Sequence, residues 1–417
     1  RPTSASGWET PAGNLLNLTP ITGANVGNRI YDAKDFYEKL GGEDVEGNAL
    51  LVDTAANYSL ANNIDLTEFT DLAGNPISWT GPSGYTGHLF GNGYTIRGLE
   101  LTRTAGETGL FNSLGDGATL ENFTLEVTTP GPLVMTGQSV FGGIVGSIAN
   151  TTATLQNITV KGSLAYTGIG NYMLMAGGFV GQVNGNSNLT MTRCVSQLDM
   201  SLGNVSGANS GIACGTMTGR VINGGTTVTI TKSYATGNIS MIVTDNVARS
   251  LYAGMVPHLY SANLIIEECY NSGNILVNGE RINGWGGSIL GNTFSTGGSA
   301  SISRCAALSE SVVVQTTAGS ASGRIFGGAT NGGITPTFSN NFARKNMLTG
   351  NDSSAQAQDD AGDAATAAGL GKSIAELKTQ STWTNPVTSG GLGWSAADWD
   401  FDGLTKSGSA FYWPRLR

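Results

Sequence analysis

Apolar residues recur in the middle of the chain in short runs that repeat about every 36 residues. Each run, such as residues 120–123 or 302–305, holds one apolar residue, two polar residues and a second apolar or small residue. The first position of successive runs falls at Leu120, Leu155, Met191, Ile230, Ile266 and Ile302, with steps of 35, 36, 39, 36 and 36 residues. A fainter seventh run ends at Phe342. A fixed period of this length is typical of repeat proteins, in which each unit stacks on the next.

The spacing inside each run predicts two strands joined by a corner. Apolar or small residues also lie two positions before each run and, apart from Asn271, two positions after it, which is the period of a strand. The polar pair, Glu121-Asn122 in the first run, breaks this alternation and is too short for a helix. One unit of about 36 residues cannot bury its apolar side alone. We therefore expect about seven coils, each adding about 4.8 Å along one axis.

A second motif lies upstream of each run and places two apolar residues between glycines. It occurs as Gly109-Leu-Phe-Asn112, Gly143-Ile-Val-Gly146, Gly178-Phe-Val-Gly181 and Gly254-Met-Val-Pro257. Glycine at these positions permits tight corners and close approach of another backbone. Two further copies, residues 215–219 and 287–291, contain one additional residue.

These segments resemble the GLUG motif, a Gly-Leu-apolar-Gly repeat of bacterial surface and adhesin-like proteins that also occurs upstream of the catalytic domain in some immunoglobulin A peptidases. The similarity covers about residues 85–345, and residues 91–96 resemble the first strand of many pectin-lyase-like β-helices. The resemblance implies an all-β fold, a right-handed parallel β-helix or solenoid. It also implies an extracellular or cell-surface location.

The two ends of the chain predict caps for this solenoid, whose open ends would otherwise expose strand edges. Residues 32–40 have apolar side chains at helical spacing, with Asp32 placed as the N-cap. We expect a mixed α/β N-terminal cap over residues 1–84, the β-helix over 85–345, and a loop with a Trp-rich C-terminal cap over 346–417. The last 35 residues hold four of the seven tryptophans, Trp383, Trp394, Trp399 and Trp413.

Composition and charge exclude some classes of partner for such a solenoid. Glycine, with 62 of 417 residues, is about twice as frequent as usual, and only 12% of residues are charged, about half the usual share. The net charge of −9 argues against nucleic acid as a partner, since phosphate binding needs clustered Lys and Arg. No run of 18 or more apolar residues occurs, so the sequence predicts no membrane span.

The sequence offers no catalytic set for an enzyme of the polysaccharide-degrading kind. Hydrolysis needs two carboxylates a few ångströms apart. The one Asp-Asp pair, Asp359-Asp360, lies outside the repeats, and His88 and His258 have no acidic neighbours in the sequence. Glu267-Glu268 falls on a predicted corner, where we expect it to face solvent.

The sequence contains one candidate metal site, and its cysteines fit the core of the solenoid. Asp398, Asp400 and Asp402 alternate as in the first half of a calcium loop, although Ser409 stands at the twelfth position, and the same alternation suits an exposed strand edge. We predict calcium there as a candidate and no other cofactor. Three of the four cysteines, Cys194, Cys269 and Cys305, share one inward column and are expected to be buried free thiols, since stacked side chains in register seldom meet disulfide geometry.

The pattern favours an extracellular, non-enzymatic interaction protein, adhesin-like, that binds a glycan or a protein on a cell or host surface through its β-faces. One alternative is a structural subunit of an extracellular filament or surface layer that self-associates end to end. The other alternative is a polysaccharide-degrading β-helix. A flat array for ice or glycan is suggested by Thr190, Thr192, Thr227, Thr229 and Thr231, but Glu121, Gln156 and Glu268 interrupt it in other copies.

Overall fold

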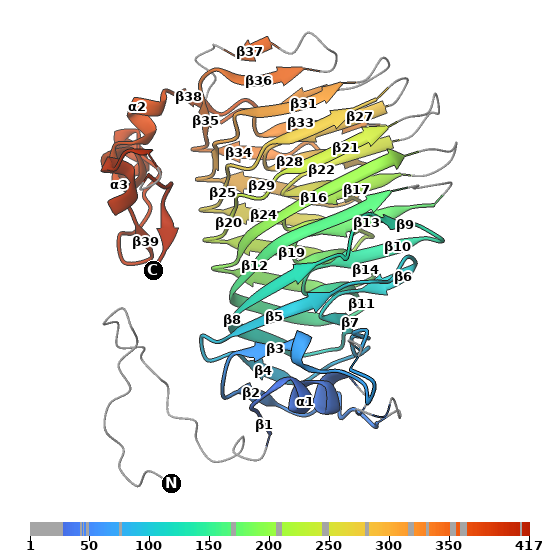
Figure 1. The fold of residues 1–417 in the computed structure, drawn as a ribbon. Helices are drawn as coiled ribbons and strands as arrows, with labels where there is room; N and C mark the ends of the chain where they lie inside the picture. The colour runs from blue at the N-terminus through green and yellow to red at the C-terminus, as the bar shows by residue number, and fades with distance from the viewer. Residues whose placement is uncertain are drawn as a thin grey trace, which may run out of the picture.

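The computed structural model shows a parallel β-solenoid of about seven coils (Figure 1). It describes residues 28–417 except 42–43, 45, 47–49, 75–76, 168–171, 206–210, 244–249, 280–282, 316–320, 331–332, 351–355, 359–364 and 409–410. The predicted all-β solenoid is confirmed. Three sheets, named sheets A, B and C below, run along the stack.

Sheet A contains 24 strands in the described part of the chain and forms two faces of the solenoid that meet at a corner. The face before the corner contains β8 (Ala118–Thr128), β12 (Thr152–Thr167), β15 (Asn188–Thr192), β19 (Thr227–Thr231), β24 (Asn263–Glu267), β29 (Ser299–Ser303) and β34 (Thr337–Ser339). Strand β8 also continues past the corner. The face after the corner contains β16 (Val195–Val205), β20 (Tyr234–Ala235), β21 (Ile239–Val243), β25 (Tyr270–Asn271), β26 (Ile275–Asn278), β30 (Ala306–Ala307), β31 (Ser311–Gln315), β35 (Phe342–Arg344) and β36 (Met347–Gly350). The long strand β12 also passes the corner and pairs with β16.

Sheets B and C have seven strands each among the described residues and complete the coils. Sheet B contains β6 (Gly106–Thr108), β10 (Ser139–Gly142), β13 (Leu174–Gly177), β17 (Ile212–Gly215), β22 (Ser250–Gly254), β27 (Asn283–Gly287) and β32 (Ala321–Gly323). Sheet C contains β7 (Phe111–Leu114), β11 (Val145–Ala149), β14 (Val180–Asn184), β18 (Thr218–Ile222), β23 (Val256–Tyr260), β28 (Leu290–Phe294) and β33 (Phe326–Thr330).

The predicted corner between two strands is a single residue in the left-handed backbone region. It is the second residue of each polar pair, with φ of 60° at Asn122 and 52° at Arg304. This conformation costs roughly 1–2 kcal/mol for most residues, and less for Asn. The corner column is Asn122, Asn157, Arg193, Lys232, Glu268, Arg304 and Asn340.

The glycine motif forms the corner between sheets B and C. A Cβ added at Gly178 would lie 2.1 Å from the Thr216 carbonyl oxygen of the next coil, and one at Gly181 would lie 2.5 Å from the Phe141 oxygen. Backbones therefore meet so closely that only glycine fits at these two positions. The additional residue inferred for residues 215–219 is wrong, because Thr216 and Thr218 occupy the places of Gly178 and Val180. The copy at Gly254 is instead one residue shorter.

The predicted apolar columns line one continuous core. Leu120, Leu155, Met191, Ile230, Ile266 and Ile302 are paired in this order by strand register and are fully buried. All four cysteines are free and buried, as expected, and burial raises the pKa of Cys194 to about 12. The seventh run ends one residue earlier than the sequence predicts, at Asn341. Phe338 pairs with Ile302, and Asn341 rather than Phe342 follows Cys305 in the inward column.

The N-terminal section closes one end of the stack. Helix α1 (Ala33–Phe36) begins at Asp32, whose side chain accepts from the Asp35 amide, and the π-helical turn η1 (Tyr37–Gly41) follows. Phe36 and Tyr37 pack on Trp79, with ring centroids 5.2 and 5.1 Å away. The first strands of sheet A lie around this helix, with β1 at the very end of the stack and β5 above the helix (Figure 1): β1 (Arg29–Ile30), β2 (Tyr58–Leu60), β3 (Ile64–Asp65), β4 (His88–Phe90) and β5 (Thr95–Glu100), with the turn η2 (Leu66–Glu68). Sheet A thus continues below residue 85.

The other end of the stack leads into the Trp-rich region. Strand β37 (Gln356–Gln358) pairs antiparallel with β36, and β38 (Leu370–Lys372) pairs with β35, while the short β9 (Leu133–Val134) pairs with β12 lower in the stack. The chain then turns back as α2 (Ile374–Leu377), α3 (Gln380–Thr384), η3 (Val387–Ser389), β39 (Trp399–Asp400), η4 (Asp402–Thr405) and β40 (Arg415–Leu416). We call residues 370–417 the C-terminal segment. It lies beside the coils rather than above them (Figure 1).

Candidate functional sites on the solenoid surface

The outer side of β8, β12, β15, β19, β24, β29 and β34 is rich in hydroxyl groups and is called the hydroxyl face. Its middle column, aligned by strand register, is Thr119, Thr154, Thr190, Thr229, Ile265, Ser301 and Thr337. Hydrogen bonds join neighbouring coils on this face. Ser299 Oγ donates to Asn263 Oδ1 at 2.9 Å, and the Thr192 and Thr231 hydroxyls lie 3.0 Å apart. The threonine array noted in the sequence is therefore a real surface, although Ile265 and Glu267 interrupt it.

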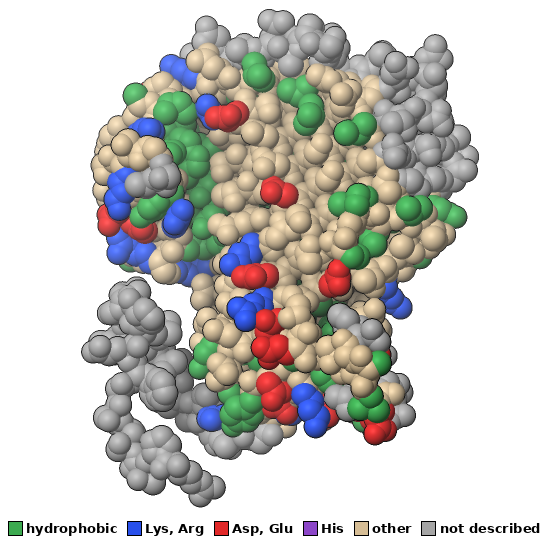
Figure 2. All heavy atoms as spheres, in the orientation of Figure 1, with side chains coloured by type: hydrophobic (Ala, Val, Ile, Leu, Met, Phe, Trp, Pro, Cys, Tyr) green, Lys and Arg blue, Asp and Glu red, His purple; other side chains and the backbone are tan. Residues whose placement is uncertain are grey.

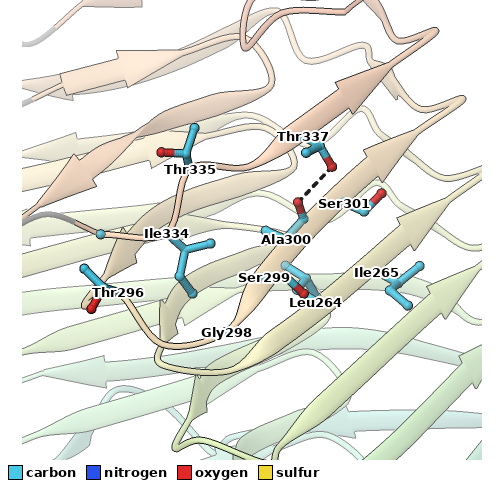
Figure 3. A pocket seen from close by; sticks show the side chains of 11 residues that line it. Leu264, Ile265, Thr296, Gly298, Ser299, Ala300, Ser301, Ile334, Thr335 and Thr337 are labelled. Atoms are coloured by element: carbon cyan, nitrogen blue, oxygen red, sulfur yellow. Dashed lines mark hydrogen bonds between the residues drawn. The ribbon is translucent and has the colours of Figure 1, made fainter.

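A groove of about 540 Å³ lies on the hydroxyl face near its C-terminal end (Figure 3). It is lined by Leu264, Ile265, Thr296, Gly298, Ser299, Ala300, Ser301, Gly333, Ile334, Thr335 and Thr337. These residues carry hydroxyl or apolar side chains and no charge. Ile265 is 41% exposed, and Thr337 Oγ1 donates to the Ala300 carbonyl at 3.2 Å. The groove offers hydroxyl donors and acceptors around an apolar floor.

The C-terminal segment packs on a second surface, which we call the flank. The flank is the outer side of sheet A directly after the corner. Tyr234 and Tyr270 stack between neighbouring coils, with ring centroids 4.7 Å apart and an interplanar angle of 4°. Trp399 lies 6.2 and 6.1 Å from these two rings, and Trp394 lies 4.4 Å from Trp399. A hydrophobic cluster separate from the solenoid core joins this flank to the C-terminal segment.

The flank changes its residue types where the C-terminal segment covers it. The outward column directly after the corner reads Thr95, Thr124, Thr159, Val195, Tyr234, Tyr270, Ala306, Phe342 and Leu370 by strand register. Threonine thus gives way to apolar and aromatic residues. In the corner column, asparagine gives way to Arg193, Lys232, Glu268 and Arg304 in the same coils.

Ion pairs connect these charged corners with the segment and with each other. The Asp398 carboxylate lies 3.1 Å from Arg193 Nη1 and 2.7 Å from Lys232 Nζ. Arg304 pairs with Glu268 at 2.6 Å and with Glu267 at 2.8 Å. The expectation that Glu267 and Glu268 both face solvent is wrong for Glu268, which is buried. Burial raises its pKa, while the positive charges of Arg304 and Lys232 act in the opposite direction.

Asp398 and Asp400, two residues of the predicted calcium site, interact with different groups in the structure. Asp398 forms the two ion pairs above, and Asp400 accepts from the Tyr412 hydroxyl at 2.8 Å and from the Asp402 amide at 2.9 Å. In the described ranges no group of three or more His, Cys, Asp or Glu side chains is placed to hold a metal ion. Asp398, Asp400 and Asp402 therefore do not converge, and the calcium site receives no support.

The other residues weighed for catalysis lie apart. His88 Nε2 lies 3.2 Å from Glu121 Oε1 of the next coil, a neighbour that the sequence did not reveal, and the His88 ring stacks on Phe90. Burial lowers the pKa of His88, whereas Glu121 acts to raise it. Asp359-Asp360 lies outside the described residues. His258 lies on sheet C, far along the stack from His88.

Charged side chains are sparse on the upper body of the face drawn in Figure 2, and they gather near the N-terminal coils and the C-terminal segment. None of the helices in the described part of the chain has the length and apolar character that a membrane crossing needs.

Comparison with known proteins gives partial matches. No family model matches the chain. The chain is 31% identical over 175 residues to "Halomucin" of Haloquadratum walsbyi, a match that covers 40% of this chain and 2% of that protein. It is 30% identical over 135 residues to a "Putative Gly-rich membrane protein" of Evansella cellulosilytica, covering 28% of this chain and 15% of the relative. The chain therefore spans a small part of these relatives.

One solved structure resembles nearly the whole chain. It is the crystal structure of a "putative immunoglobulin A1 protease" from Bacteroides ovatus, with a TM-score of 0.51 and 16% sequence identity. The match covers 93% of this chain and 91% of that one. At this identity the likeness shows the fold alone, which is a β-solenoid with its flanking segments.

Proposed function

We propose that this chain is the repeat body of an extracellular, non-enzymatic interaction protein, adhesin-like, that binds a glycan through its hydroxyl face. The observation that carries the proposal is the groove beside Ile265, Ser301 and Thr337. Ligand sites are concave and combine apolar walls with a few polar groups that fix orientation. The partial matches to "Halomucin" and to a Gly-rich membrane protein support a surface location.

The chemistry of the groove favours a neutral glycan over a charged partner. Its lining residues carry no charge, so a charged ligand would lose hydration without gaining an ion pair. The hydroxyls of Ser299, Ser301 and Thr337 can donate to or accept from sugar hydroxyls. Ile265 and Ile334 provide the apolar contact that the C–H face of a sugar ring needs.

Binding of the full chain to an array of neutral and charged glycans tests this proposal. The variant Ser301→Phe fills the groove and is expected to abolish binding of the neutral glycans that the wild type retains. The matched control is Thr154→Phe, which places the same ring in the same column of the hydroxyl face outside the groove. The proposal would be overturned if the wild type bound none of the neutral glycans, or if both variants bound them equally.

The two alternatives have weaker support. End-to-end assembly into a filament needs an open strand edge, but α1 with η1 lies at one end of the stack and β37 and β38 lie at the other. A polysaccharide-degrading enzyme needs two carboxylates that are available to substrate. Glu267, Glu268 and Asp398 are instead held in ion pairs with Arg304, Arg193 and Lys232.

A further inference from the structure

The outer sides of sheets B and C turn toward each other in a crease on the solenoid surface. The glycines of the repeated motif bring the two backbones together there: a Cβ at Gly291 would lie 2.6 Å from the Ala253 carbonyl oxygen. In three successive coils the crease holds large side chains and one cation. We call this group the aromatic crease, formed by Arg220, Tyr252, His258, Tyr260, Trp285 and Phe294.

The rings of the aromatic crease are stacked along the solenoid axis. Tyr252 stacks on Trp285 of the next coil, with centroids 5.6 Å apart at 20°, and Tyr260 stacks on Phe294 at 5.2 Å and 16°. His258 lies against Tyr252 at 4.3 Å and 10°. Tyr252 and His258 are buried, while Trp285, Tyr260 and Phe294 are half-buried. The two stacks therefore present aromatic surface to solvent over a buried layer.

Arg220 differs from the arginines at the corners of sheet A. Arg193 and Arg304 each pair with a carboxylate, whereas Arg220 has none within the described ranges. Its neighbours are the phenol side chains of Tyr252 and Tyr260 and the imidazole of His258, and burial lowers the pKa of Arg220. Arg220 Nε and His258 Nε2 are buried and have no hydrogen-bond partner among the residues that the structure describes. A largely buried guanidinium without an anion is unfavourable.

We infer that the aromatic crease is a binding site for an anionic saccharide. The Arg220 guanidinium pairs with a carboxylate or sulfate of the sugar, because its planar fork matches such groups in a bidentate manner. Trp285 and the Tyr260–Phe294 stack contact the apolar C–H faces of neighbouring sugar rings, as flat aromatic side chains with an exposed face do. Among the described residues Arg220 is the one cation of the aromatic crease, and it is set among rings, which favours one anionic sugar over a polyphosphate.

This site is independent of the groove on the hydroxyl face, because the two surfaces share no residue. It takes a charged ligand where the groove takes a neutral one. Variants in one surface are therefore expected to leave binding at the other unchanged, so the two proposals fail separately.

The experiment is a calorimetric titration of the full chain with oligosaccharides of equal length. The probes are a glucuronate-containing oligosaccharide, a sulfated dextran oligosaccharide, an unmodified dextran oligosaccharide and an oligo-aspartate peptide. We expect at least one of the two anionic saccharides to bind, with quenching of tryptophan fluorescence from Trp285, and the other two probes not to bind at this site. The better of the two anionic probes distinguishes carboxylate from sulfate.

Variants assign the binding to the crease. Arg220→Gln is expected to weaken binding about tenfold to a hundredfold, the usual worth of a hydrogen bond to a charged group. Trp285→Ala is expected to weaken it about tenfold. Arg97→Gln is the matched control, since Arg97 is an exposed arginine paired with Asp65 on another surface. Ser301→Phe is expected to have no effect on this ligand.

Each contrary result is informative. The proposal is overturned if neither anionic saccharide binds, if unmodified dextran or oligo-aspartate binds as tightly to the Ser301→Phe variant, whose groove is filled, or if Arg220→Gln binds the anionic saccharide like the wild type. Thermal unfolding identifies variants that fail to fold. Arg220→Lys serves in that case, because it keeps the charge but loses the bidentate fork, and an affinity equal to that of the wild type would also contradict the assignment.

Discussion

The Arg193 guanidinium lies 3.1 Å from the Asp398 carboxylate, although 205 residues separate the two in the sequence. Arg193 has a left-handed backbone conformation at a solenoid corner, where Asn122 and Asn157 stand in lower coils. Asparagine tolerates this conformation better than arginine does. The charged corner therefore gives up some local stability and gains an ion pair with the C-terminal segment. The same exchange at Lys232 ties two successive coils to one carboxylate.

The first prediction concerns this contact. Asp398→Asn removes both ion pairs and is expected to lower the free energy of undocking the C-terminal segment by about 1 kcal/mol, since partly exposed pairs are worth little more. Urea unfolding followed by tryptophan fluorescence reports the change, because Trp394 and Trp399 lie in the contact. Asp402→Asn is the control. An equal effect of both variants would show that Asp398 has no special role.

The second prediction concerns the left-handed corners. Asn340 has φ of 55°, so Asn340→Gly is expected to change the free energy of unfolding by only a few tenths of a kcal/mol. Asn340→Ala is expected to lower it by about 1 kcal/mol, because alanine is strained in this region. Chemical denaturation of both variants measures the difference. A greater loss for the glycine variant than for the alanine variant would contradict the assigned conformation.

The third prediction concerns the glycine motif. A Cβ at Gly181 would lie 2.5 Å from the Phe141 carbonyl oxygen, which is backbone and cannot move alone. Gly181→Ala is therefore expected to lower the free energy of unfolding by about 1–3 kcal/mol. Gly131→Ala is the control, since its Cβ would have nothing within 4 Å. Thermal denaturation compares the two, and equal melting temperatures would rule out the close backbone approach.

The fourth prediction concerns pH. Burial, with Arg220 nearby, lowers the pKa of His258 to about 3, whereas an unfolded histidine has a pKa of about 6.5. As the pH falls below 6.5, His258 becomes protonated in the unfolded chain but stays neutral in the folded chain. The free energy of unfolding therefore decreases. This loss approaches about 1.4 kcal/mol per pH unit and ends near pH 3.

The variant His258→Asn isolates that contribution. Asn292 occupies the same column in the next coil, so asparagine suits the position. Denaturation between pH 7 and 5 should show a flatter dependence for the variant than for the wild type. The comparison concerns the slope, since loss of the ring also changes the absolute stability. Parallel curves would mean that folded His258 takes up its proton as readily as the unfolded residue does, which contradicts the lowered pKa.

The repeating columns were predictable because strand period and coil length act on every copy alike. Leu120 and Ile302 obey the same rule although many coils separate them, and the polar pair between the columns marked the corner correctly. The helix that begins at Asp32 was also predictable, since its N-cap is local in sequence.

Contacts between coils and across the flank were not predictable from one copy. Glu121 contacts His88, and Arg220 lies among rings of the following coil. Both contacts depend on the register in which the coils stack, which a single copy of the repeat does not contain. Glu268 appeared exposed because nothing in its own copy showed that Arg304 would pair with it and that it would be buried. The sequence did contain one signal of the surface that the C-terminal segment covers. In the later copies, charged residues replace Asn157 and aromatic residues replace Thr159.

The most direct test of the stacked solenoid is the distance between spin labels at Thr154→Cys and Ser301→Cys. The four native thiols are buried and should resist labelling. Strand register places the two positions in one outward column, four coil steps apart. We expect a single narrow distance near 19 Å, which is four strand spacings of about 4.8 Å, broadened by the label arms. A wide distribution, or a main distance beyond about 30 Å, would contradict the stack.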